Sequence, residues 1–162
     1  MADSSFDVVS DFDQQELVNT LDQVRREVGT RFDFKGAKVS LELGKDEIIL
    51  LADDEFRAAS AKDLVQTKAV RRGLSLKVFD WGKLEPAAGG TVRQRIGLHR
   101  GLTSEQAKEI SKTVRDRFPK VKPVIQGDAV RVSGKSKNDL QGVIAHLREL
   151  DYTVALQFTN YR

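Results

Sequence analysis

The feature that most constrains this chain is an order of helices and strands that occurs twice. Helix, strand, strand, helix, strand is expected from residue 13 to about 80 and again from 103 to 160. A further alternating segment precedes each copy, FDVVS at 6–10 and VRQRIGL at 92–98. Strand–helix–strand–strand–helix–strand is the ferredoxin-like plan, in which both helices cover one face of a four-stranded antiparallel sheet. The sequence therefore predicts an α+β protein made of two ferredoxin-like domains.

Four helices and several strands are predicted by periodicity and by capping signals. The helices are expected at about 13–29, 54–72, 103–118 and 136–150. Thr103 and Gln106 form a capping box, and Pro119 ends the same helix. Strands are expected at RFDFK, KVSLEL, EIILLA, SLKVF, KPVIQ, AVRVS and in the final TVALQFTNYR, whereas KLEPAAGG at 83–90 is expected to be a linker or long turn.

The segment TRFDFKG at 30–36 separates charged and aromatic residues by parity. Successive strand residues point to opposite faces, so Arg31, Asp33 and Lys35 would share one face and Phe32 and Phe34 the other. We expect the two phenylalanines to pack in the core. The charged residues are then expected on the open face of the sheet, where this fold can bind a ligand.

The same parity argument places further basic residues on open sheet faces. The residues expected to face outward are Arg93, Arg95, Arg131, Ser133, Gln157, Thr159 and Tyr161. A guanidinium group matches phosphate oxygens and stacks on bases, so this set favours an anionic or nucleotide ligand. An ordinary solvated sheet face remains the alternative.

Charge is divided unevenly along the sequence. Residues 1–90 have 13 Lys and Arg against 17 Asp and Glu, a balance of −4, and residues 91–162 have 14 against 7, a balance of +7. A basic second half suggests an anionic partner, although small domains can also differ in charge by chance.

Several classes of function are disfavoured. The chain has no cysteine, which excludes disulfides and thiolate chemistry, and its two histidines have no neighbours at metal-ligand spacing. Neither a signal peptide nor an apolar run long enough to span a bilayer is recognised, so a cytoplasmic protein without membrane attachment is expected. No catalytic motif, cofactor motif or paired carboxylates stand out, so we expect no enzyme. Gly134, Lys135 and Ser136 precede a predicted helix N-terminus, where amides and an ammonium group can meet a phosphate.

Six segments, in order, resemble the bacterial YajQ family across essentially the whole chain. They are SFDVVS, TRFDFKG, RRGLSLKVFDWGK, TVRQ, IQGDAVRVSGKSKNDLQ and LQFTNYR. The resemblance implies that the two ferredoxin-like domains exchange their first strands. The N-terminal domain would span 12–98 and include strand 92–98, and the C-terminal domain would span 99–162 and be completed by strand 5–10. It also implies a non-enzymatic nucleotide-binding protein, with cyclic di-GMP, GTP and tRNA as ligands in the family.

The residue patterns and the resemblance together give one set of candidate nucleotide-binding residues. It comprises Arg31, Asp33, Lys35, Arg93, Arg95, Gln126, Gly127, Arg131, Gly134, Lys135 and Gln157. WGK, NYR and KSKNDLQ depart from the common family motifs, and the last has less positive charge beside the expected phosphate edge. Three hypotheses follow: a nucleotide-binding protein such as a cyclic di-GMP receptor, an RNA- or tRNA-binding module, and an adaptor whose binding to a regulatory protein is tuned by a nucleotide.

Overall fold

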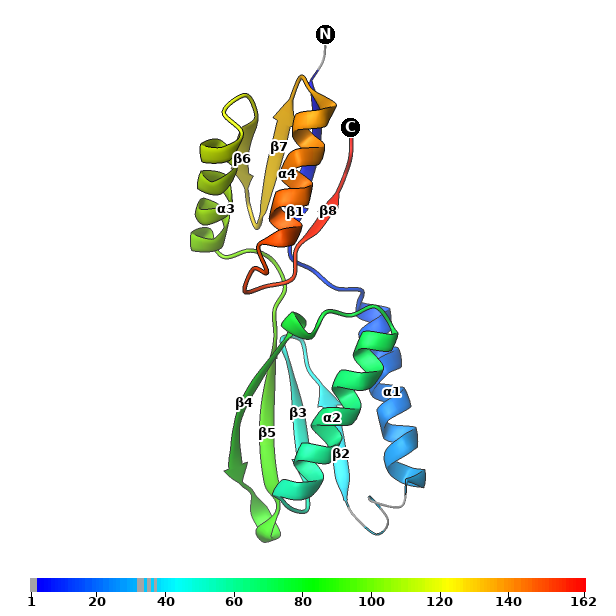
Figure 1. Cartoon of the computed structure of the whole chain (residues 1–162). Helices are drawn as coiled ribbons and strands as arrows, with labels where there is room; N and C mark the ends of the chain where they lie inside the picture. The colour runs from blue at the N-terminus through cyan, green and yellow to red at the C-terminus, as the bar shows by residue number, and fades with distance from the viewer. Residues whose placement is uncertain (1–2, 32–33, 35, 37) are drawn as a thin grey trace. The chain divides into compact units, whose positions relative to one another are not determined.

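The computed structural model of the chain describes residues 3–31, 34, 36 and 38–162 (Figure 1). The chain divides into two compact units. The N-terminal unit comprises residues 12–99, and the C-terminal unit comprises residues 1–11 together with 100–162.

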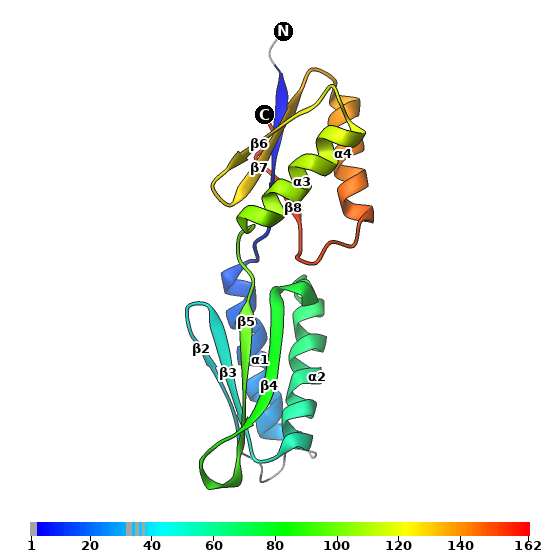
Figure 2. The same cartoon turned by 90° about the vertical axis from the view of Figure 1, so that its left-hand side faces the viewer.

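The N-terminal unit has one antiparallel sheet with the strand order β2-β3-β5-β4. Its helices both cover the same face of this sheet (Figure 2). In chain order its elements are α1 (Gln14–Thr30), β2 (Val39–Leu43), β3 (Glu47–Ala52), α2 (Glu55–Arg71), the 3-10 turn η2 (Leu76–Val78), β4 (Phe79–Pro86), the short turn η3 (Ala88–Gly90) and β5 (Val92–Leu98).

The C-terminal unit repeats the plan with the strand order β6-β7-β1-β8. Its elements are β1 (Ser4–Val9), α3 (Ser104–Arg117), β6 (Lys122–Gln126), β7 (Ala129–Gly134), α4 (Lys137–Glu149) and β8 (Gln157–Thr159). In Figure 1 the N-terminal strand, drawn in blue, lies between β7 and β8 of this sheet.

Each sheet takes one central strand from beyond its own sequence repeat. Strand β5 pairs with β3 and β4 in the N-terminal unit, and β1 pairs with β7 and β8 in the C-terminal unit. A central strand forms hydrogen bonds along both edges, so neither sheet is complete without it. The predicted fold class, two ferredoxin-like domains with exchanged first strands, is confirmed.

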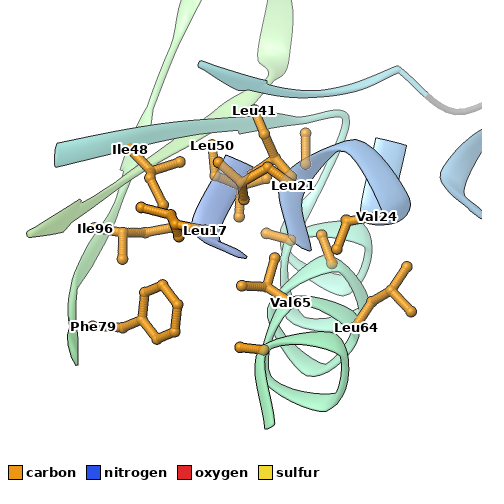
Figure 3. Packing of buried hydrophobic residues seen from close by; sticks show 14 of the residues in the cluster. Leu17, Leu21, Val24, Leu41, Ile48, Leu50, Leu64, Val65, Phe79 and Ile96 are labelled. Atoms are coloured by element: carbon orange, nitrogen blue, oxygen red, sulfur yellow. The ribbon is translucent and has the colours of Figure 1, made fainter. Parts of the chain in front are cut away.

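Each unit has its own apolar core between helices and sheet. In the N-terminal unit Leu17 and Leu21 of α1 and Val65 of α2 pack against Ile48 and Ile96 of the sheet (Figure 3). The C-terminal core joins strand residues to α3 and α4 in the same manner; it includes Phe6, Val8, Val130, Val132, Ile110, Val114, Val143 and Leu147. The alternation of buried and exposed positions along these strands leaves the opposite sheet faces uncovered by helices.

The strand predicted at TRFDFKG is wrong for the residues that the structure describes there. Helix α1 continues to Thr30, whose hydroxyl donates to the Arg26 and Glu27 carbonyls. Arg31 is the C-cap, and the Phe34 amide donates to its carbonyl at 3.1 Å in a turn. Helical hydrogen bonding therefore overrides the alternating pattern. Phe34 is nevertheless buried in the core, as expected.

Strand β4 also begins and ends later than predicted. SLKVF contains η2, in which the Ser75 hydroxyl caps the Lys77 amide, and the strand continues through Pro86 into the segment expected to be a linker. Pairing with β5 extends β4, and a register shift between Trp81 and Leu84 accommodates its extra residues.

Candidate functional site

The C-terminal unit contains a cavity of about 260 Å³ beside the start of α4. Three separated segments line it: the beginning of β1, the first two turns of α4 and the residues that follow β8. The lining residues are Ser4, Ser5, Phe6, Lys137, Leu140, Gln141, Ile144, Tyr161 and Arg162.

The first turn of α4 gives this cavity its positive end. Ser136 is the N-cap, and its hydroxyl accepts the Asp139 amide at 3.2 Å. Lys137 is the first helical residue and lines the cavity. Unpaired backbone amides and the helix dipole favour an anion at a helix N-terminus, and a lysine there adds a full charge.

Apolar and aromatic side chains form the rest of the cavity. Phe6, Leu140 and Ile144 belong to the core and provide an apolar floor. The Tyr161 ring lies 6.2 Å from the Phe6 ring, tilted by 35°, and its residue is 60% exposed. An exposed ring over an apolar floor can stack a flat heterocycle, and the Gln141 amide offers both a donor and an acceptor. The cavity thus combines an aromatic wall with a cationic end.

Arg131 does not line this cavity but lies in an ion pair on the open face of the same sheet. Its Nε donates to Asp7 Oδ1 at 3.0 Å and its Nη2 to Oδ2 at 3.4 Å. Asn160 Nδ2 donates to Asp7 Oδ2 at 2.9 Å. The Arg131 hydrogen bond, against the effect of burial and aided by Asn160, lowers the pKa of Asp7, and the same bond raises the pKa of Arg131. The charge of Arg131 is therefore matched locally.

The other candidates in this unit lie apart from one another. Gln126 lies opposite Ala129 at the end of β6, Gln157 lies opposite Val9 at the start of β8, and Gln157 Oε1 accepts the Asp11 backbone N–H at 2.7 Å. Gly127 occupies the β6–β7 turn with a φ of +61°. At the opposite end of β7, Gly134 packs beside Val121 and Leu140, and Lys135 precedes the α4 cap.

In the N-terminal unit Arg93 and Arg95 lie on the open sheet face, and both are paired with glutamates. Arg93 Nη2 lies 3.2 Å from Glu85 Oε2 on β4, and Arg95 Nη1 lies 3.0 Å from Glu47 Oε1 on β3. Parity along one strand identifies the arginines, but only strand register brings these carboxylates beside them.

Arg31 lies away from that face, at the C-terminal end of α1. Its guanidinium is 5.5 Å from the centre of the Phe34 ring. It lines a second cavity, of about 320 Å³, with Glu27, Lys68 and Arg71, and there Lys68 forms an ion pair with Glu27. Asp33 and Lys35 lie outside the described residues, and the structure does not bring Arg31 together with Arg93 and Arg95.

Strand exchange also removes the charge asymmetry between the two halves of the sequence. Strand β1 and its flanks bring three aspartates to the C-terminal unit, while Arg93 and Arg95 move to the N-terminal unit. The C-terminal unit then has 12 Lys and Arg against 10 Asp and Glu, and the N-terminal unit 15 against 14. The basic second half of the sequence therefore does not form a strongly basic unit, because sequence halves are not the folded units.

Lys137, Gln141 and the serines of β1 line the cavity but were not among the residues predicted from the sequence. A signal was present, since SFDVVS, KSKNDLQ and LQFTNYR all contribute to this one cavity. Within the described part of the chain, no cluster of three or more potential metal ligands occurs. No helix among the described residues has the length and hydropathy needed to cross a membrane.

The fold and cavity define a class: strand-exchanged ferredoxin-like proteins with a small cationic and aromatic pocket. The family model described as nucleotide-binding protein YajQ-like matches residues 4–162. A nucleotide-binding protein of Chloroflexus aggregans is 59% identical over 99% of this chain and 98% of its own length. Another from Synechococcus elongatus is 57% identical over 98% of both chains. The chain belongs to the YajQ-like family of nucleotide-binding proteins.

Proposed function

We propose that this protein binds a nucleotide in the cavity of the C-terminal unit. The observation that supports this proposal most directly is that one cavity is lined both by Lys137, at the start of α4, and by the exposed ring of Tyr161, above an apolar floor. The phosphate would lie at Lys137 and the first amides of α4, and the base would stack on Tyr161. Gln141 would bond to the base edge. The names of the relatives support a nucleotide as the ligand.

The size of the cavity bears on which nucleotide binds. Its volume of about 260 Å³ lies below the roughly 300–1,000 Å³ of pockets that enclose drug-sized ligands. One mononucleotide unit is therefore the natural occupant. Cyclic di-GMP would place one guanylate half in the cavity and leave the other outside, so a cyclic di-GMP receptor remains compatible with this site. Binding, rather than catalysis, is the proposed activity, in the cytoplasm.

The paired arginines on the sheet faces are not assigned a phosphate-binding role in this proposal. A phosphate arriving at Arg131, Arg93 or Arg95 must compete with a carboxylate already in place. Charge-assisted bonds to those carboxylates would have to be broken first. We therefore assign the phosphate to Lys137 and not to the open sheet faces.

Calorimetric titration with GMP, GTP and cyclic di-GMP tests the proposal. Lys137→Ala is expected to weaken binding about tenfold or more, because a hydrogen bond to a charged group contributes roughly 1.5–3 kcal/mol. Tyr161→Ala should also weaken binding, and Tyr161→Phe should not. Lys122→Ala is the matched control, since it removes an exposed lysine of the same unit outside the cavity.

Two results would contradict the proposal. One is the absence of saturable binding by any of the three nucleotides. The other is an equal loss of affinity in Lys122→Ala and Lys137→Ala, which would indicate a diffuse charge effect. Saturable binding of tRNA alone, weakening steeply with salt, would favour the RNA-binding alternative, and nucleotide-dependent binding of a protein partner would favour the adaptor.

A further inference from the structure

The cavity wall formed by Tyr161 depends on an irregularity in the chain after β8. Thr159 lies opposite Asp7, and Arg162 exchanges both backbone hydrogen bonds with Ser5, at 3.1 and 2.9 Å. Between these two pairs, Asn160 and Tyr161 together oppose the single residue Phe6. Two residues opposing one is a β-bulge, and here Asn160 has a left-handed φ of +57°.

This bulge reverses the face to which Tyr161 belongs. With strict alternation after Phe158, Tyr161 would point to the open face, as the sequence predicts. The bulge instead places its ring beside Phe6 and in the cavity lining. The Asn160 side chain takes the open face and reaches Asp7. Asparagine suits this position because it tolerates the left-handed region better than most residues.

The carboxylate of Asp7 is well placed to hold the bulge. Its side chain is only 16% exposed, and Arg131 fixes its orientation through two N–H groups. From that position Asp7 Oδ2 accepts a hydrogen bond from the side-chain Nδ2 of Asn160 at 2.9 Å. Asp7 itself does not line the cavity.

We propose that Asp7 is a positioning residue for the cavity: through Asn160 it fixes the bulge that presents Tyr161 to the ligand. The proposal rests on the proposed function for its effect on affinity, but not for its effect on Tyr161. The competing explanation is that the Ser5–Arg162 backbone bonds and the Phe6–Tyr161 contact suffice without Asp7.

Removing the Asp7 carboxylate should change nucleotide affinity in opposite directions, depending on whether its charge or its tie to Asn160 matters more. Loss of a carboxylate makes the unit more positive, which by charge alone would strengthen the binding of an anionic nucleotide. Loss of the tie to Asn160 lets Tyr161 leave the cavity, which weakens binding. The sign of the change therefore separates the two effects.

The experiment combines fluorine NMR with GMP titration on the full chain. The protein has two tyrosines, so labelling with 3-fluorotyrosine gives one resonance for Tyr161 and one for Tyr152. In ligand-free Asp7→Ala the Tyr161 resonance is expected to move toward that of an unfolded peptide, while the Tyr152 resonance stays in place. The Kd for GMP is expected to rise at least threefold.

Two variants make the result decisive. Asn160→Gly keeps the left-handed backbone and the Asp7–Arg131 pair but removes the tie, so it should reproduce both effects even if Asp7→Ala does not fold. Asp139→Ala removes a carboxylate from the first turn of α4 without touching the bulge. It should leave the Tyr161 resonance unchanged and the Kd equal or lower.

The proposal is overturned if Tyr161 keeps its resonance in the folded variants, or if Asp7→Ala binds GMP more tightly. If the unaltered protein binds no nucleotide, the proposed function fails, and the ligand-free spectra still decide whether Asp7 positions Tyr161.

Discussion

At the scale of single residues, the arginines on the sheet surfaces are each paired with a carboxylate. Arg131, Arg93 and Arg95 each contact a carboxylate from a neighbouring strand. The Asp7 pair is the most shielded, with side chains 16% and 32% exposed, whereas the other two pairs are more open to solvent. Exposed pairs contribute little to stability, so we expect a measurable effect mainly from Asp7.

The shifted pKa of Asp7 predicts a pH-dependent contribution to stability. The Arg131 hydrogen bond holds this pKa below its ordinary value of 3.8. A carboxyl with a lowered folded-state pKa stabilises the fold above its unfolded value, and this contribution is lost as pH falls through the folded value. In urea unfolding, the stability difference between the unaltered protein and Asp7→Asn should be full at about pH 7 and should shrink below about pH 4. A constant difference would contradict the assignment.

Phe34 supports the core although it does not lie in a strand. It is 1% exposed, so Phe34→Ala should lower the free energy of unfolding by about 3–5 kcal/mol. Phe56, which is 64% exposed, is the matched control, and Phe56→Ala should cost less than about 1 kcal/mol. Chemical denaturation measures both. Similar losses in the two variants would show that Phe34 is not a core residue.

At the scale of elements, the bulge in β4 depends on Gly82. A Cβ atom at this position would lie 2.7 Å from the backbone oxygen of Arg95 on β5, too close for any rotation of a side chain to relieve. Gly82→Ala should therefore destabilise the N-terminal unit by about 1–3 kcal/mol.

Gly29→Ala, in the same unit, is expected to stabilise the protein, whereas Gly82→Ala should destabilise it. Gly29 lies within α1, and, apart from its chain neighbours and its own helix backbone, no atom of the described residues is within 4 Å of the site of its Cβ. Alanine should stabilise this helix by up to about 1 kcal/mol, because glycine loses more backbone entropy on folding. Thermal melts of both variants test the pair of predictions. Equal changes in melting temperature, of the same sign, in Gly82→Ala and Gly29→Ala would contradict the proposed need for glycine in β4.

At the scale of the whole molecule, strand exchange leaves one unit made of a single chain segment and the other made of two separate segments. The N-terminal unit is one continuous segment, residues 12–99, and contains all four of its strands. The C-terminal unit is two segments, and its central strand β1 is separated from the rest by the entire N-terminal unit.

This difference predicts the behaviour of fragments. Residues 12–99 should fold alone, as judged by circular dichroism and dispersed NMR amide signals. Residues 100–162 should not, because without β1 the sheet is split between β7 and β8. Adding a peptide of residues 1–11 should restore the folded spectrum. A folded 100–162 fragment without the peptide would contradict this role of β1.

Much of the architecture follows from local signals in the sequence. Apolar periodicity and capping residues such as Asp13, Thr103 and Ser136 locate all four helices, and alternation locates most of the strands. These signals are readable because they act within one or two turns or along one strand. Where two local signals compete, as at TRFDFKG, the alternating pattern gives the wrong element.

The sequence by itself determined the two ferredoxin-like repeats, the buried faces of their elements and, through its motifs, membership of the family. Only the tertiary structure decided which carboxylate neutralises each arginine, where Tyr161 points and which residues form the cavity. These features depend on strand register and on one left-handed residue, and the contacts of Asp7 with Arg131 and Asn160 join residues 124 and 153 positions apart. A one-residue change in register moves a side chain to the other face, so local pattern alone cannot assign such contacts.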